Sequence, residues 1–283
     1  MMSCRNAVLK EARAQAFGEC SPLAKQGNAE AQFYIGGRYD SGDGVPQDYE
    51  EAVRWYRLSA EQGNTFAAFM LGQKYYRGQG VPQDYQQAVR WYRLSAEDGN
   101  RFAAFALGEM YSSGVGRPQN DKEAVRWYQL SAEQGYADGQ VSLGRQYEFG
   151  VGVPKSYAEA AKWYQKAADQ GDSIGELSLG IFYFKGHGVI QDFIESAKWY
   201  RKAAEQGHPA GQAYLAAMYA DGRGVPQDYV LAHMWYNLSA SRSDSLFLPY
   251  RTEARDAVAA KMTPPQIGEA QRLARQWKPT KAK

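Results

Sequence analysis

The sequence has few residues of the kinds that build metal centres or disulfide frameworks: its 283 residues include two cysteines and three histidines. His187, His208 and His233 stand far apart, with no second ligand at metal spacing, so we expect neither a metal site nor a cofactor. Cys4 and Cys20 share one terminal segment. They could form a disulfide in an oxidising compartment or serve as small buried apolar residues.

The chain also lacks a charge excess and long apolar runs. A formal net charge of +2 gives no reason to expect nucleic acid or an anionic membrane as a partner. No apolar run approaches the roughly 18 residues of a membrane-spanning helix, and the first residues lack the apolar block of a secretory leader. We therefore expect a cytoplasmic protein, or a periplasmic or secreted one if a leader has been removed.

The chain does contain a strict internal repeat. A Trp-Tyr pair recurs every 36 residues, and a period of this size indicates a supersecondary unit copied along an axis. The six pairs are Trp55-Tyr56, Trp91-Tyr92, Trp127-Tyr128, Trp163-Tyr164, Trp199-Tyr200 and Trp235-Tyr236. Their equivalent positions predict that the Trp rings fill the same gap between repeats, although a ladder for stacking a ligand is the alternative.

The period predicts three parts of the chain. Residues 1–27 form a degenerate N-terminal capping segment, residues 28–243 form six full repeats, and residues 244–283 form a C-terminal helical cap with a basic tail that we expect to be frayed. The cap is expected to contain helices over 248–262 and 263–277. The six repeats cover 28–63, 64–99, 100–135, 136–171, 172–207 and 208–243.

Each repeat reads as two helices. In the first repeat Ala31, Ile35 and Tyr39 form one helical stripe, and the second helix runs from Tyr49 to Gln62 after Asp48, a good N-cap residue. A glycine recurs beside the stripe, which predicts a close approach of the two helices. Its positions are Gly36, Gly72, Gly108, Gly144 and Gly180, with Ala216 in the sixth repeat.

These motifs closely resemble the Sel-1-like repeat, a longer-looped relative of the tetratricopeptide repeat. The resemblance rests on segments 31–36, 42–49, 55–56 and 60–63 and their copies. It implies an all-α fold, a right-handed superhelical α-solenoid of antiparallel helix pairs whose first helices line the concave side. It also implies an adaptor, such as a bacterial complex-assembly or toxin-neutralising protein. Cysteine-rich members have been linked to β-lactam binding, but this chain has too few cysteines to match them.

One segment resembles a catalytic motif. Residues 171–175 read Gly-Asp-Ser-Ile-Gly, which matches the nucleophile elbow, but that motif needs a preceding strand. Here it spans the junction of two helical repeats, so we interpret it as coincidence and predict no catalytic residue.

The first helices carry the most informative signal, on the face opposite the Ala31 stripe. This face is aromatic in repeats two and three and aliphatic in repeat five, whereas the corresponding residues elsewhere include Glu30 and Asp138. Because the fold does not require apolar residues there, we predict a partner-binding face; packing between repeats is the alternative for the series containing Phe33. The predicted binding residues are Phe66, Phe69, Gln73, Tyr76, Phe102, Phe105, Glu109, Arg145, Ile174, Leu177, Ile181 and Phe184.

The sequence therefore predicts a non-enzymatic adaptor that binds a peptide or helix of a protein partner, as a monomer or weak homodimer. A self-associating structural scaffold is the second hypothesis, and a β-lactam-binding enzyme a remote third.

Overall fold

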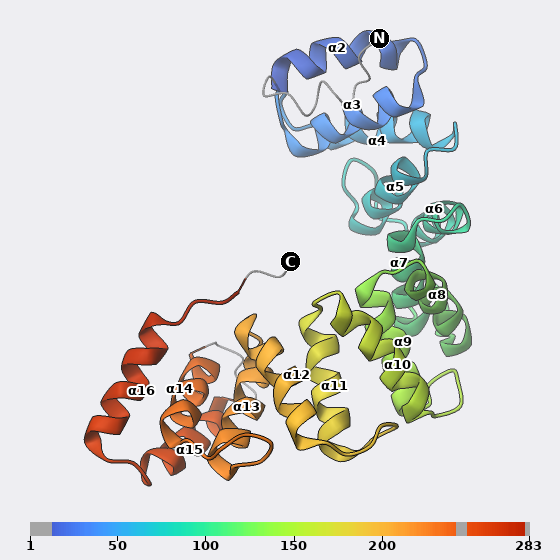
Figure 1. Cartoon of the computed structure of the whole chain (residues 1–283). Coiled ribbons are helices and arrows are strands. Elements are labelled where there is room, and N and C mark those ends of the chain that lie inside the picture. The colour runs from blue at the N-terminus through green and yellow to red at the C-terminus, as the bar shows by residue number, and fades with distance from the viewer. Residues whose placement is uncertain (1–12, 242–247, 281–283) are drawn as a thin grey trace. The chain divides into compact units, whose positions relative to one another are not determined.

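The computed structural model describes residues 13–241 and 248–280, and these residues contain helices and no strands. The prediction of an all-α solenoid of antiparallel helix pairs is confirmed (Figure 1). The chain forms two compact units, residues 1–139 and 140–283, which we describe separately. Within the described residues, no helix is both long and apolar enough to cross a lipid bilayer.

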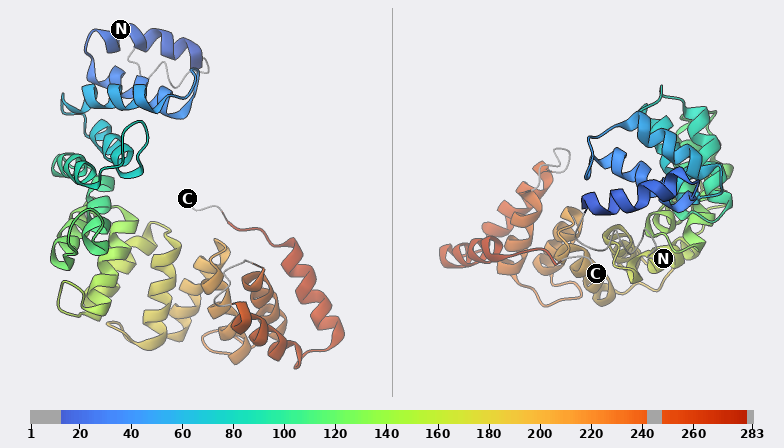
Figure 2. Two further views of the ribbon diagram at one scale, coloured as in Figure 1. Left: turned by 180° about the vertical axis from the view of Figure 1, so that it is seen from behind. Right: turned by 90° about the horizontal axis from the view of Figure 1, so that it is seen from above.

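The first unit contains α2 to α8, and α9 (Ala137–Phe149) begins in it and continues into the second. Successive helices pack on each other in antiparallel pairs (Figures 1 and 2). The helices of the first unit are α2 (Arg13–Lys25), α3 (Ala29–Ser41), α4 (Tyr49–Ala60), α5 (Thr65–Arg77), α6 (Tyr85–Glu97), α7 (Arg101–Ser113) and α8 (Asp121–Glu133).

The second unit continues the same alternation, and its last two helices, α15 and α16, pack on α14. Its helices are α10 (Tyr157–Asp169), α11 (Ser173–Lys185), α12 (Phe193–Glu205), α13 (Pro209–Asp221), α14 (Tyr229–Ala240), α15 (Leu248–Ala259) and α16 (Pro264–Gln276).

The connectors end one helix and begin the next as predicted. Gly42 has φ 71°, a left-handed conformation that suits glycine, and its N–H donates to the Arg38 carbonyl. The Asp48 carboxylate accepts hydrogen bonds from the backbone N–H groups of Glu50 and Glu51, both at 3.0 Å. These contacts satisfy amides that the first turn of α4 leaves without a partner.

The recurring glycine has the structural role that its position predicts. A Cβ atom added at Gly36 would lie 2.7 Å from a ring carbon of Tyr56, and at Gly108 the distance to Tyr128 would be 2.5 Å. Both distances are shorter than a carbon–carbon contact allows. The tyrosine of each Trp-Tyr pair therefore packs directly on the backbone of the preceding helix.

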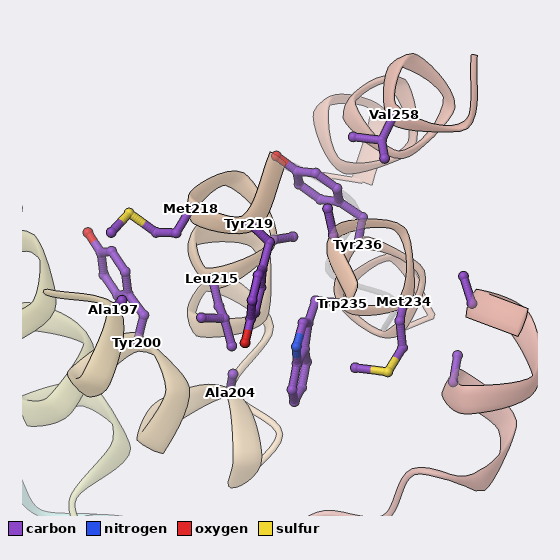
Figure 3. Packing of buried hydrophobic residues seen from close by; sticks show 14 residues of the cluster. Ala197, Tyr200, Ala204, Leu215, Met218, Tyr219, Met234, Trp235, Tyr236 and Val258 are labelled. Atoms are coloured by element: carbon purple, nitrogen blue, oxygen red, sulfur yellow. The ribbon is translucent and has the colours of Figure 1, made fainter. Parts of the chain in front are cut away.

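The core of the second unit extends into its C-terminal helices. Figure 3 shows Leu215 and Tyr219 of α13 between Tyr200 of α12 and Trp235 of α14. The rings of Trp235 and Trp277 lie 6.0 Å apart, so the end of α16 packs against the last Trp-Tyr pair. The six repeat tryptophans are buried or half-buried, which supports packing over a ligand ladder.

Two predictions concern the ends of the chain. Cys20 is buried, but Cys4 lies outside the described residues, so the disulfide stays a hypothesis. In the tail, the backbone N–H of Thr280 donates to the Glu205 carbonyl at 2.8 Å, and the expected fraying stays a prediction. The last three residues lie outside the described part of the chain.

Candidate protein-interaction site

Aromatic rings form a row along the first helices of the first unit. We call this row the aromatic wall; its members are Phe33, Phe66, Phe69, Phe102, Phe105 and Tyr136. Each contact joins one repeat to the next, with ring centroids 6.3 Å apart for Phe33 and Phe66 and 6.1 Å apart for Phe69 and Phe102. Tyr136 closes the row at 5.0 Å from Phe102 and 5.3 Å from Phe105.

The wall is supported from beneath by the second helices. The rings of Phe33, Phe69 and Phe105 lie 6.0, 5.7 and 6.0 Å from those of Tyr56, Tyr92 and Tyr128. The wall residues are nevertheless only half-buried, and Phe66 is 55% exposed. The Phe33 series therefore packs between repeats and remains partly exposed, and its role in binding stays a prediction.

A hollow of about 730 Å³ opens on the wall, and we call it the aromatic hollow. It gathers residues from α5 to α7, the connectors that follow α7 and α8, and the second-helix ring Tyr92. Six of the twelve predicted binding residues line it. The lining consists of Phe69, Gln73, Tyr76, Arg77, Tyr92, Phe102, Phe105, Ala106, Glu109, Met110, Ser113, Val115 and Tyr136.

Polar groups surround the apolar floor of the hollow. The Glu109 carboxylate accepts a hydrogen bond from the Tyr128 hydroxyl at 2.5 Å, which orients it. Arg77 is exposed and makes no ion pair within the described part of the unit. Burial raises the pKa of the Tyr92 phenol well above its ordinary value of 10.0, so this group stays a neutral donor at physiological pH.

The sequence did not indicate Tyr136, Tyr92 or Arg77 as site residues. Tyr136 stands where the first three repeats have Asn28, Asn64 and Asn100, each of which caps a first helix. The loss of that cap residue is the signal that could have indicated a different role. Tyr92 is hidden in the core motif itself, where packing explains its presence.

The structure places the predicted residues of the second unit differently. Leu177, Ile181 and Phe184 are half-buried and pack against the core cluster of α12 to α14. The Phe184 ring also lies 5.3 Å from that of Phe193. Ile174 is half-buried at the start of α11, and Arg145 is exposed on α9. Leu177, Ile181 and Phe184 therefore pack between neighbouring helices, whereas a binding role for Ile174 and Arg145 stays a prediction.

The remaining motifs have structural roles. Asp172 is the N-cap of α11 and accepts from the N–H groups of Ile174 and Gly175, so residues 171–175 form a helix start and no nucleophile elbow. The His187 ring stacks on Tyr157 at 4.2 Å, and His208 is the N-cap of α13. No group of three or more potential metal ligands occurs among the described residues.

Comparison with known proteins identifies the repeat. A sequence profile of the Sel1 repeat matches residues 29–64, 65–100, 101–136, 137–172, 173–208 and 209–244. No curated protein matches this chain.

Two solved structures are similar over most of the chain. The Sel1 repeat protein from Oxalobacter formigenes shares 31% identity over 82% of this chain and 93% of that chain, with a TM-score of 0.71. The protein c5321, a protective antigen present in uropathogenic Escherichia coli strains, shares 28% identity over 93% of this chain and 79% of that chain, with a TM-score of 0.51. The six matched repeats together cover more than half of the sequence, and the chain therefore belongs to the Sel1 repeat family.

Proposed function

We propose that this protein is a non-enzymatic adaptor whose aromatic hollow binds a short segment of a protein partner. The observation that carries the proposal is that rings which the repeat does not require line one hollow. Phe102 corresponds to Glu30 in the first repeat and Asp138 in the fourth, so packing of the fold does not require an aromatic side chain there. Sel1 repeats generally mediate protein interactions, in agreement with this role.

The chemistry of the lining describes the segment that would bind. A hollow of about 730 Å³ is within the size range of ligand pockets, about 300 to 1,000 Å³. It would take one or two large apolar side chains between Phe69, Phe102 and Phe105. Arg77 at the rim would pair with a carboxylate next to the apolar anchor, and Glu109 and Gln73 would accept backbone or side-chain donors. We therefore expect a partner segment with an apolar anchor beside an acidic residue.

The second unit contributes less to this proposal. Leu177, Ile181 and Phe184 pack within the helix stack, so their removal would cost stability before it cost binding. The proposed site is accordingly the part of the predicted set in the first unit: Phe66, Phe69, Gln73, Tyr76, Phe102, Phe105 and Glu109.

Selection of peptides from a random library on the immobilised protein tests the proposal. Selected peptides should bind the wild-type protein and lose about tenfold or more in affinity with Phe102→Ser, the loss typical of a central aromatic anchor. Arg77→Glu should shift the selected sequences from acidic to basic residues beside the anchor.

Leu58→Ser is the matched control, because Leu58 is an apolar residue of the second helix, 38% exposed and outside the hollow. Peptides that bind the wild-type protein, Phe102→Ser and Leu58→Ser with equal affinity would show that the aromatic hollow is not the site. The melting temperature of each variant separates a lost surface from a lost fold.

Self-association is the second candidate function, because the exposed ring of Phe66 could equally pack on a second copy of the chain. Analytical ultracentrifugation of the wild-type protein and Phe66→Ser distinguishes the two. A dimer that Phe66→Ser converts to a monomer supports self-association, and a monomer at tens of micromolar supports the adaptor.

A further inference from the structure

A second hollow lies where α6 meets the connector between α7 and α8. It has a volume of about 580 Å³, and we call it the arginine hollow because Arg90, Arg93 and Arg117 line it. A corresponding hollow of about 520 Å³ occurs two repeats later, lined by the equivalent Lys162, Gln165 and Val189. The repeat therefore builds the hollow, while the three arginines are particular to the junction of the second and third repeats.

Arg117 departs from the repeat. The other five connectors have a valine at this position: Val45, Val81, Val153, Val189 and Val225. The Arg117 guanidinium stacks on the Tyr111 ring, 3.4 Å from its centroid, and its Nε and Nη1 atoms are buried with no hydrogen-bond partner among the described residues. Buried N–H groups without an acceptor are costly, so stacking on Tyr111 alone does not account for an arginine at this half-buried position.

Arg90 differs from the equivalent basic residues because the repeat's glutamate is missing three residues before it. In four other repeats the basic residue at this position pairs with a glutamate three residues earlier, at N–O distances between 2.5 and 3.8 Å. The pairs are Glu51 with Arg54, Glu123 with Arg126, Glu159 with Lys162 and Glu195 with Lys198. In the second repeat Gln87 replaces the glutamate, and Arg90 has no carboxylate partner in the described residues.

The third arginine is held in place beside the other two. Arg93 donates from Nη2 to the Tyr111 hydroxyl at 3.0 Å, the same tyrosine whose ring supports Arg117. Glu97 is the one carboxylate in the lining, so three guanidinium groups leave an excess of two positive charges. Two independent departures from the repeat thus act at this hollow. Arg117 adds a positive charge, and Gln87 takes the place of the carboxylate that would pair with Arg90.

We propose that the arginine hollow binds an oxyanion, either a phosphate or a carboxylate group of a small molecule. Arg90, Arg93 and Arg117 would contact it, with Tyr111 holding Arg93 and Arg117 in position. Guanidinium groups suit such ligands because they offer paired N–H donors in a planar fork. This site is separate from the aromatic hollow and does not depend on the adaptor function.

Nuclear magnetic resonance titration of the full chain tests the proposal, with inorganic phosphate and glutarate as separate probes and sodium chloride holding the ionic strength constant. The wild-type protein should show saturable shifts of the Arg117 and Gly116 backbone amides with a dissociation constant in the millimolar range. Saturation by one probe alone identifies the oxyanion class, and saturation by both assigns the shared chemistry; each supports the proposal.

The variants restore what the other repeats contain. Arg117→Val combined with Gln87→Glu should weaken binding of the probe by about tenfold or more. The melting temperature should stay equal or rise, because other repeats have valine and glutamate at these two positions. In the opposite direction, Glu159→Gln with Gln165→Arg and Val189→Arg should add a second saturable site in the second unit. The proposal would be overturned if neither probe saturated the wild-type protein. It would also be overturned if the Arg117→Val/Gln87→Glu variant bound a probe with the same affinity as the wild-type protein.

Discussion

One contact between successive first helices in each unit solves the same packing problem with different chemistry. In the first unit Lys74 of α5 is 4% exposed and forms an ion pair with Asp40 of α3. The equivalent positions in the second unit hold Met218 and Phe184, which belong to or pack against one apolar cluster. The solenoid therefore accepts either a buried ion pair or an apolar contact between successive first helices, and the choice leaves room for local specialisation.

The same comparison applies to the exposed face of the first helices. In the first unit this face keeps half-buried aromatic rings around a hollow, whereas in the second Leu177, Ile181 and Phe184 pack into the stack. Residues that vary at a fixed repeat position thus have different meanings in the two units. Variants at these positions test whether the packing of the first helices differs between the two units.

Replacement of Asp40 should have the largest effect on the free energy of unfolding. Asp40→Ala leaves the Lys74 ammonium buried without its partner, and we expect a loss of about 3 kcal/mol or more of unfolding free energy. Urea denaturation measures it. Adding Lys74→Met, as at Met218, should recover most of the loss; if the double variant is no more stable than Asp40→Ala, the ion pair and the apolar contact are not interchangeable.

The close approach of helices should be equally strict at Gly108 of the first unit and Gly144 of the second, although the sixth repeat has Ala216 at this position. Gly108→Ala and Gly144→Ala each place a Cβ 2.5 to 2.7 Å from a tyrosine ring carbon, which should destabilise the protein by about 2 kcal/mol. Thermal unfolding is a suitable measurement. Gly268→Ala is the control, since nothing lies within 4 Å of its Cβ in α16, and it should raise stability by about 0.5 to 1 kcal/mol. A neutral result at both interior glycines would contradict the packing argument.

Glu176 of the second unit should make stability depend on pH. Its carboxyl is 4% exposed and accepts a hydrogen bond from Gln206, whereas the equivalent Gln32 and Gln140 accept the same bond as amides. Burial raises the pKa of Glu176 from 4.5 to about 7, although Lys202 and Gln206 oppose the shift.

The folded protein therefore keeps a proton that the unfolded chain releases, and this contribution is lost as pH rises from about 4.5 through about 7. Glu176→Gln should be more stable than the wild-type protein by about 1 to 2 kcal/mol at pH 8 and equal to it at pH 4.5. Urea denaturation at both values checks this; an equal gain at both would point to a cause other than ionisation.

The smallest changes in stability should distinguish the first-helix face of the first unit from that of the second unit. Leu177→Ala removes a half-buried side chain from the second unit's core and should cost about 1 to 2 kcal/mol. Phe66→Ser should change stability by less than about 0.5 kcal/mol, because more than half of that side chain already faces solvent. A larger loss for Phe66→Ser than for Leu177→Ala, measured by chemical denaturation, would place the aromatic wall in the core.

Much of the fold could be predicted from local signals. The Asp48 cap, the Gly42 helix end and the Gly36 contact with Tyr56 each depend on residues within about half a repeat, and all three are present in the structure. The aromatic hollow could be predicted only in part. Helical periodicity placed Phe69, Phe102 and Phe105 on one face. Tyr92 and Tyr136 reach the same hollow from α6 and from the connector after α8, and no periodicity along a first helix indicates that.

The 36-residue period, the helix pairs, their caps and the family were determined by the sequence itself, because these features depend on short spacings repeated six times. Only the tertiary structure decided which variable residues meet. The pairing of Lys74 with Asp40, 34 residues apart, and the hydrogen bond from Arg93 to Tyr111, 18 residues apart, arise when neighbouring repeats dock. The structural effect of a change at one repeat position depends on the side chains that surround it after the helices have packed. That environment is a property of the packed helices.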